Sequence, residues 1–185
     1  MVVFGLAGWS GSGKTTMLAR LLPALIARGI SVSTVKHAHH GFDVDQPGKD
    51  SHRHRQAGAR EVMISSARRW ALMHELRAGS DPEPEPDLDD LLARMSPVDL
   101  VLVEGFKRAA YDKLEIHRAA LAKPLLAPED ARIVAIAADQ PVPESRLPRF
   151  PLDDIEGIAG FILAHLGLSP GPAASRSPVL TGPAS

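Results

Sequence analysis

Gly8-Trp9-Ser10-Gly11-Ser12-Gly13-Lys14-Thr15 is the stretch that decides the fold, because it fits the pattern G-x-x-x-x-G-K-[ST] of a phosphate-binding loop. It follows a short apolar run, Val2–Ala7, and precedes a segment with helical periodicity from Thr15 to Arg28. Glycines let backbone N–H groups turn inward toward phosphate oxygens, and the start of the helix adds its positive dipole end. The sequence therefore predicts a strand, a phosphate loop and a helix, with a flexible Gly-Ser turn as the alternative.

The loop also predicts the roles of its last two residues. Lys14 is expected to reach the β- and γ-phosphates of a nucleoside triphosphate as a point charge. The Thr15 hydroxyl is expected to complete the oxygen shell of a Mg²⁺ ion that otherwise keeps water ligands. The motif therefore predicts a nucleotide bound together with magnesium.

Beyond the loop, strands and helices alternate along the chain. The segment from Ile30 to Lys36 is a second expected strand, which completes a βαβ unit and implies parallel pairing. Further strands are expected at Leu100–Val103, Lys113–His117 and Ile133–Ala137. Helices are expected at 49–57, 87–95 and 152–166, and residues 62–65 and 70–76 are expected to form strands of a hairpin or arm outside the main sheet. The pattern predicts an α/β fold of the three-layer P-loop NTPase type, with a mainly parallel sheet and an extra β-hairpin arm.

The length and composition of the chain indicate one domain. The chain has 185 residues, which suits a single buried core, and we predict one nucleotide-binding domain over residues 1–168. Acid and proline alternate over residues 79–87, which predicts an extended surface linker inside that domain. The segment 169–185 is rich in Pro, Gly, Ala and Ser and is predicted to be disordered.

Charge and cysteine content exclude several classes of function. The formal net charge is −1, so no broad positive field is expected to hold nucleic acid. The chain contains no cysteine, which excludes disulfides, thiolate metal sites and cysteine nucleophiles and fits a cytoplasmic location. No apolar run approaches the roughly 20 residues that span a bilayer, so no membrane association is expected.

Acidic residues near the loop are the next candidates. Ligands of parallel α/β sheets collect at the carboxyl ends of the strands. Of the two acids that flank residues 100–103, Asp99 and Glu104, only Glu104 lies at that end, so it is the candidate magnesium partner. Asp139 ends the run before Gln140 and is a candidate acceptor for the two donors of guanine, although the Asn-Lys-x-Asp form is missing. Asp50, in a polar loop region, is a candidate to join the magnesium shell or orient water.

Two other interpretations of the sequence stay open. His37, His39, His40, His52 and His54 suggest a metallochaperone GTPase, because imidazoles bind zinc, nickel and copper. A small-molecule kinase of the same fold is the other possibility, with a lid formed by Arg53, Arg55, Arg68 and Arg69.

The order of several short motifs gives the sequence a family resemblance. After the loop come His37-Ala38-His39-His40, then Gly48-Lys49-Asp50-Ser51, then Ala57-Gly58-Ala59 and finally Val103-Glu104-Gly105-Phe106-Lys107. With these motifs in this order over roughly Val2 to Asp139, the chain resembles the MobB family of molybdopterin-guanine dinucleotide biosynthesis adaptor proteins.

The resemblance implies a GTP-binding, weakly hydrolysing protein that forms a homodimer. It would assist molybdenum cofactor guanylyltransferase, the enzyme that attaches GMP to molybdopterin, and other cofactor-assembly proteins. By the same resemblance Gly11 to Thr16 would bind phosphates, Thr15 and Glu104 would serve Mg²⁺, and Asp50 would belong to a mobile active-site segment with a metal-binding or catalytic role. The strands between residues 62 and 76 would contribute to the dimer.

Overall fold

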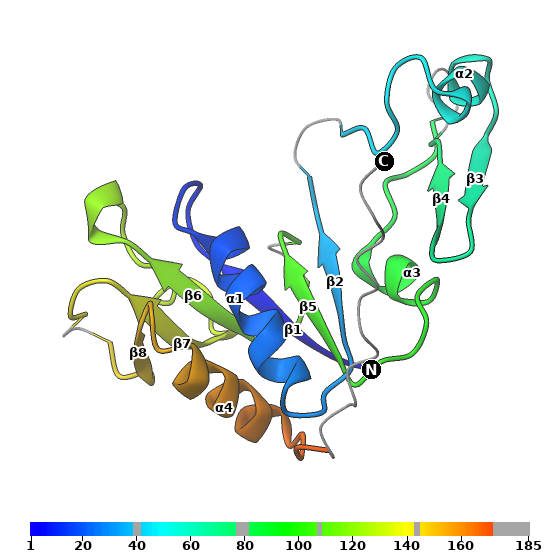
Figure 1. Ribbon diagram of the computed structural model, residues 1–185. Helices are drawn as coiled ribbons and strands as arrows, with labels where there is room; N and C mark the ends of the chain where they lie inside the picture. Colours follow the sequence, from blue (N-terminus) through cyan, green and yellow to red (C-terminus); the bar gives the residue numbers. More distant parts are fainter. Residues whose placement is uncertain (39–41, 77–81, 107–108, 143–144, 172–185) are drawn as a thin grey trace, which may run out of the picture. The chain divides into compact units, whose positions relative to one another are not determined.

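A computed structural model describes residues 1–38, 42–76, 82–106, 109–142 and 145–171. The chain forms two compact units (Figure 1). Met1–His37 and the chain from Ser96 onward make the first unit, and Ala38–Met95 makes the second. The single domain expected over residues 1–168 stays a prediction. Residues 79–81 of the expected linker and all but the first three residues of the expected disordered tail lie outside the described residues.

The first unit is built on a six-stranded sheet whose strands are all parallel, in the order β2-β5-β1-β6-β7-β8. This sheet confirms the predicted α/β class. The strands are β1 (Val2–Ala7), β2 (Val32–Lys36), β5 (Leu100–Glu104), β6 (Lys113–His117), β7 (Ile133–Ala138) and β8 (Arg149–Pro151). The edge strand β8 was not predicted, because three residues that include a proline are too short to show a period of two.

Two helices, α1 (Lys14–Ile26) and α4 (Ile155–Leu166), lie side by side on one face of this sheet (Figure 1). Alternate residues of the strands point at them, and the shared core contains Phe4, Leu21, Leu102, Leu114, Ala137 and Ile162. Helix α1 continues through Pro23, with Leu21 and Leu25 on either side fully buried. Packing therefore compensates for the backbone hydrogen bond that a proline removes.

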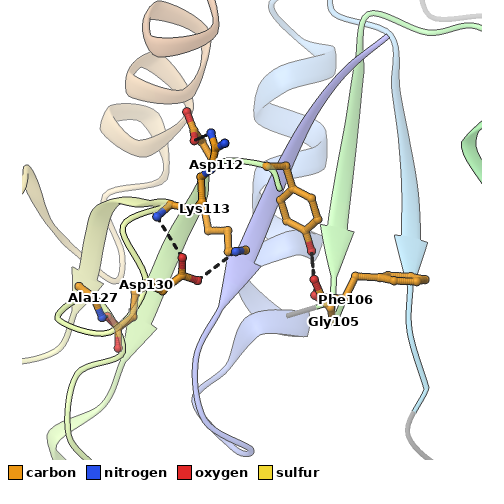
Figure 2. A network of polar contacts seen from close by, with 9 residues as sticks. Gly105, Phe106, Asp112, Lys113, Ala127 and Asp130 are labelled. Carbon is orange, nitrogen blue, oxygen red and sulfur yellow. Dashed lines mark hydrogen bonds and ion pairs between the residues drawn. The ribbon is translucent and has the colours of Figure 1, made fainter. Parts of the chain in front are cut away.

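The opposite face of β6 carries two buried charged side chains, Lys113 and Glu115. The segment that follows the strand satisfies both of them. Lys113 Nζ donates to Asp130 Oδ2 at 2.9 Å (Figure 2), and Glu115 accepts from the backbone N–H groups of Leu126 at 2.7 Å and Ala127 at 2.9 Å. Residues 118–130 are thereby tied to the sheet, which matters for the site because the same residues flank the phosphate loop.

The second unit contains the separate antiparallel hairpin. Its elements are α2 (Asp50–Gln56), β3 (Glu61–Ser65), β4 (Trp70–His74) and α3 (Leu88–Leu92). Within the described parts of the chain, β3 and β4 pair only with each other, which confirms the predicted arm outside the main sheet. Met63 and Trp70 on the hairpin remain 64% and 65% exposed. Among the described residues, none of the helices has the length and apolar character needed to cross a membrane.

Candidate functional site

The loop from Gly8 to Thr15 joins β1 to α1, as the motif requires. Gly8 has a φ of 143°, and a Cβ atom placed there would lie 2.5 Å from both Ile116 O and Ser12 Oγ, so only glycine fits. Gly13 adopts the left-handed conformation immediately before the helix, where it lets the backbone turn into the first helical residue, Lys14. Ser10 is exposed. The sequence therefore folds locally into the strand, loop and helix that its pattern predicts.

The amino terminus of α1 differs from that of α4. Helix α4 is capped by Asp154, whose Oδ1 accepts from Gly157 N at 2.9 Å. Among the described residues, no side chain caps α1, and its first turn contains no acidic residue. Uncapped N–H groups and the helix dipole together favour an external anion at this end.

Two side chains inside the loop are suited to an anion. Lys14 Nζ donates to Gly8 O at 2.9 Å and to Trp9 O at 3.0 Å, so its ammonium lies across the loop. Ser12 is fully buried, and its Oγ has no hydrogen-bond partner among the described residues. A buried hydroxyl without a partner is costly, which makes Ser12 Oγ a ready donor for a ligand oxygen.

Glu104 contacts the loop directly. The Thr15 hydroxyl donates to its carboxylate, with both Oε1 and Oε2 at 3.0 Å. The register of the sheet explains this contact, because Glu104 ends β5 and lies between Leu6 of β1 and Lys36 of β2. Asp99 lies at the other end of β5, where the Ser31 hydroxyl and amide hydrogen-bond it and hold its pKa below the usual range. Glu104 is therefore the acid on the loop side of β5, as predicted. Asp99 instead links the start of β5 to Ser31 at the start of β2.

The turn after Glu104 is held in an unusual conformation. Gly105 has a φ of 101° and Phe106 a φ of 43°. Tyr111 Oη donates to the carbonyl oxygens of both, at 2.8 and 3.2 Å (Figure 2), and the ring of His37 packs on that of Phe106 with centroids 4.8 Å apart. Burial raises the pKa of Tyr111 to about 12, so this phenol stays a donor at ordinary pH.

Arg118 lies on the other side of the loop and was missed from the sequence. It follows β6, and its Nε donates to Ser12 O at 3.0 Å. Trp9 contacts the same segment, since its Nε1 donates to Pro124 O at 2.8 Å. The sequence could have indicated this residue, because Arg118 comes directly after a predicted strand. Ligands of parallel sheets bind at the carboxyl ends of the strands, which is the rule that identified Glu104.

Asp139 follows β7, near the short helix η1 (Ala119–Leu121). Its Oδ1 accepts from Ala119 N at 2.9 Å, and its Oδ2 has no hydrogen-bond partner within the part of the chain that the structure describes. The residue lines a hollow of about 460 Å³ between the ends of β7 and β8, together with Ala138, Gln140, Pro141, Val142, Arg149, Phe150 and Pro151. The carboxylate is thus placed to accept one or two donors of a ligand there.

Several other candidates lie elsewhere. Asp50 is the first residue of α2 in the second unit, so its role in the site stays a prediction. Thr16, in the first turn of α1, is exposed. Arg55 is engaged within the second unit, where Nη2 contacts Asp43 and Asp45 at 2.8 Å each, and its hydrogen bond to Asp45 lowers the pKa of that carboxyl.

The interpretation of the histidines as a transition-metal site stays open. His39 and His40 lie outside the described residues, and no group of three or more potential ligands is found among the residues that are described. The convergence of cradle, lysine, hydroxyl and carboxylate instead suits an anion with an associated hard cation.

The chain resembles known proteins both in sequence and in fold. Residues 3–139 match the family model of MobB, molybdopterin guanine dinucleotide synthesis protein B. The chain is 44% identical over 160 residues to the molybdopterin-guanine dinucleotide biosynthesis adapter protein of Escherichia coli K12, with 85% of this chain and 89% of that protein covered. The adapter protein of the same name from Haemophilus influenzae is 43% identical over 164 residues, with 86% of each chain covered. A crystal structure of molybdopterin-guanine biosynthesis protein B superimposes with a TM-score of 0.69 at 32% identity, covering 90% of this chain and 99% of that one.

Proposed function

The chain belongs to the MobB family, and from this premise we propose that it is a GTP-dependent adaptor in the biosynthesis of molybdopterin-guanine dinucleotide. The observation that carries the nucleotide part of the proposal is the contact of Thr15 with Glu104 beside the phosphate loop. This contact joins a hydroxyl and a carboxylate, the two kinds of oxygen that magnesium takes from P-loop proteins. The contact lies at the start of an uncapped helix, and such a helix end favours the binding of phosphate groups.

The residues of the loop fit a nucleoside triphosphate. Backbone N–H groups from Gly11 to Thr16 would bind the phosphates, and Ser12 Oγ would gain the partner that it lacks among the described residues. Lys14 would exchange its carbonyl partners for the β- and γ-phosphates. Thr15 and Glu104 would hold Mg²⁺, which when bound neutralises the charge of the phosphates. By the family resemblance, Asp50 would have a metal-binding or catalytic role.

Asp139 would select the base. The residue lines a hollow, and a carboxylate can accept from both N1–H and the exocyclic amine of guanine, an arrangement that adenine does not offer. Hydrolysis is expected to be slow, so that the bound state of the protein, rather than a new metabolite, is what a partner recognises.

The partners follow from the family. The protein would assist molybdenum cofactor guanylyltransferase, which attaches GMP to molybdopterin, and act among other cofactor-assembly proteins. It would do so as a homodimer, with the β3–β4 hairpin contributing to the contact between copies. The exposed Met63 and Trp70 support this part of the proposal, because an isolated hairpin with exposed apolar side chains gains stability by being covered.

A competition experiment tests the nucleotide proposal. Binding of labelled GTP to the purified protein with Mg²⁺ would be displaced by unlabelled GTP and by ATP. We expect ATP to compete at least ten-fold less well than GTP, which corresponds to about 1.4 kcal/mol for the hydrogen bonds to Asp139 that adenine cannot donate. Lys14→Ala should weaken GTP binding at least a hundred-fold, because it removes the charge at the centre of the loop.

Asp139→Ala separates base choice from phosphate binding. This variant should lose the preference for GTP over ATP while it keeps its affinity for inorganic tripolyphosphate. Equal affinity of the wild type for GTP and ATP would contradict the assignment of Asp139. Addition of the wild type, but not Lys14→Ala, should raise the yield of dinucleotide cofactor from the guanylyltransferase, and an equal yield with both would contradict the GTP-dependent adaptor role.

A further inference from the structure

Arg118 is a cation at the phosphate loop that the motif does not include. Its Nε donates to Ser12 O at 3.0 Å, and a Cβ atom placed on Gly13 would lie 3.4 Å from its Nη2. Among the described residues, the guanidinium makes only this hydrogen bond to Ser12. The N–H groups of its two terminal nitrogens therefore remain available to donate to a ligand. A guanidinium with available donors beside residues that cradle phosphate is suited to an anion.

The sheet places Arg118 on the opposite side of the loop from Glu104. Strands β5 and β6 both pair with β1, one on each side. Glu104 ends β5, whereas Arg118 follows β6 and Asp139 follows β7, the next strand in the same direction. A nucleotide whose metal lies near Glu104 and whose base lies near Asp139 would therefore place its α-phosphate, the phosphate nearest to the sugar, beside Arg118.

Hydrogen bonds hold the segment of Arg118 in place before any ligand binds. Ala119 N donates to Asp139, Trp9 Nε1 donates to Pro124 O, and Glu115 accepts from the amides of Leu126 and Ala127. Lys113 and Asp130 add an ion pair at the far end of the same segment (Figure 2). The backbone that carries the guanidinium is thus preorganised, which lowers the entropic cost of binding a ligand there.

We propose that Arg118 is a nucleotide-binding residue that contacts the α-phosphate, on the side of the loop away from the metal. This inference rests on the proposed nucleotide-binding function and adds to it a cation that recognises what GTP and GDP have in common. Its contribution is to affinity. The γ-phosphate and the hydrolysis step belong to the Glu104 side.

Three substitutions at Arg118 test the proposal by equilibrium binding of GTP and GDP with Mg²⁺. Arg118→Ala and Arg118→Gln should each weaken both nucleotides about ten-fold and by the same factor, because each removes a charge-assisted hydrogen bond to phosphate. Arg118→Lys should weaken binding less, since it keeps a charge. Hydrolysis at saturating GTP should change less than two-fold in all three. Arg132→Ala removes an exposed arginine at the amino end of β7 and should bind both nucleotides as the wild type does.

Arg118→Gln also separates a charge interaction from a purely structural one. Glutamine can still donate to Ser12 O, so wild-type affinity in this variant would show that Arg118 only supports the loop, and the proposal would be wrong. Weaker binding of GTP alone, accompanied by slower hydrolysis, would place the guanidinium on the γ-phosphate and overturn the assignment. A folded wild type that binds no nucleotide would refute the proposed function and this inference together, whereas wild-type binding with unaffected Arg118 variants refutes this inference alone.

Discussion

The two sides of the phosphate loop are built in different ways. On the β5 side, a carboxylate contacts Thr15 from a strand end, and the next two residues have positive φ angles of 101° and 43°. On the β6 side, a guanidinium contacts Ser12 from a segment that is tied down by a fully buried carboxylate, Glu115. One side depends on a strained turn, and the other depends on buried polar anchors.

This difference suggests a division of labour in the proposed function. A turn held in a sparsely populated conformation stores strain that a ligand can release, which suits the side that would sense magnesium and the γ-phosphate. A segment fixed by charge-assisted hydrogen bonds keeps its shape, which suits the side that would bind the part of the nucleotide common to GTP and GDP. Perturbing each side separately tests this division.

The largest effect is expected from Glu115→Ala, which breaks the β6 side. The change leaves the part-buried N–H groups of Leu126 and Ala127 without their acceptor, so the free energy of unfolding should fall by about 2–4 kcal/mol. Urea unfolding measures this decrease. The chain has two tryptophans, so a Trp70→Phe background leaves Trp9 as the reporter of its hydrogen bond with Pro124. Its emission in the folded variant should shift to longer wavelength as that hydrogen bond loosens.

Glu129→Ala is the matched control, because Glu129 is exposed on the same segment. It should change the free energy of unfolding by less than about 0.5 kcal/mol. If Glu115→Ala proves equally mild, the buried carboxylate does not anchor the segment, and the contrast between the two sides disappears.

The same comparison shows how far the sequence could predict the molecule. Glu104 is predictable because it ends an apolar run that forms a buried parallel strand, and the phosphate loop is predictable because its glycines have fixed spacing. Glu115 gives no such signal. In Lys113-Leu114-Glu115-Ile116-His117 the alternation predicts polar side chains that face water, and only the later segment, folded back over the strand, buries them. Contacts between residues distant in the sequence decide this burial, so local periodicity cannot reveal it.

A smaller effect is expected from Gly105→Ala, which breaks the β5 side. A Cβ atom at Gly105 would lie 2.5 Å from His37 Cβ, and alanine disfavours a φ of 101°. The free energy of unfolding should fall by about 2 kcal/mol, measured by urea unfolding. Because the turn follows Glu104, the affinity for GTP should also depend less on Mg²⁺ than in the wild type, while the affinity without Mg²⁺ is retained.

Gly160→Ala provides a control of opposite sign. Gly160 is exposed in the middle of α4, and nothing lies within 4 Å of a Cβ atom placed there. Alanine should therefore stabilise the protein by roughly 0.5–1 kcal/mol through helix propensity. A Gly105→Ala variant that is as stable as the wild type would show that the turn relaxes without cost and stores no strain.

The smallest effect is expected from Tyr111→Phe, which sharpens the comparison without breaking either side. The change removes the hydrogen bonds to Gly105 O and Phe106 O but keeps the ring, which lies against Gly5. The free energy of unfolding at pH 7 should fall by about 1 kcal/mol. Since the folded pKa of about 12 is raised above the ordinary 10, the phenol contributes stability that is fully present below pH 10 and lost as the pH rises toward 12.

Two measurements check this prediction. Tyr111 is the only tyrosine of the chain, so its absorbance near 295 nm reports its ionisation directly, and the midpoint in the folded protein should lie near pH 12. The difference in stability between the wild type and Tyr111→Phe should stay constant from pH 6 to 9. On the proposed division of labour, Tyr111→Phe should alter the Mg²⁺ dependence of GTP binding and leave GDP affinity without Mg²⁺ unchanged, because only the Glu104 turn is loosened. An equal weakening for both nucleotides would mean that the two sides of the loop respond as one structure.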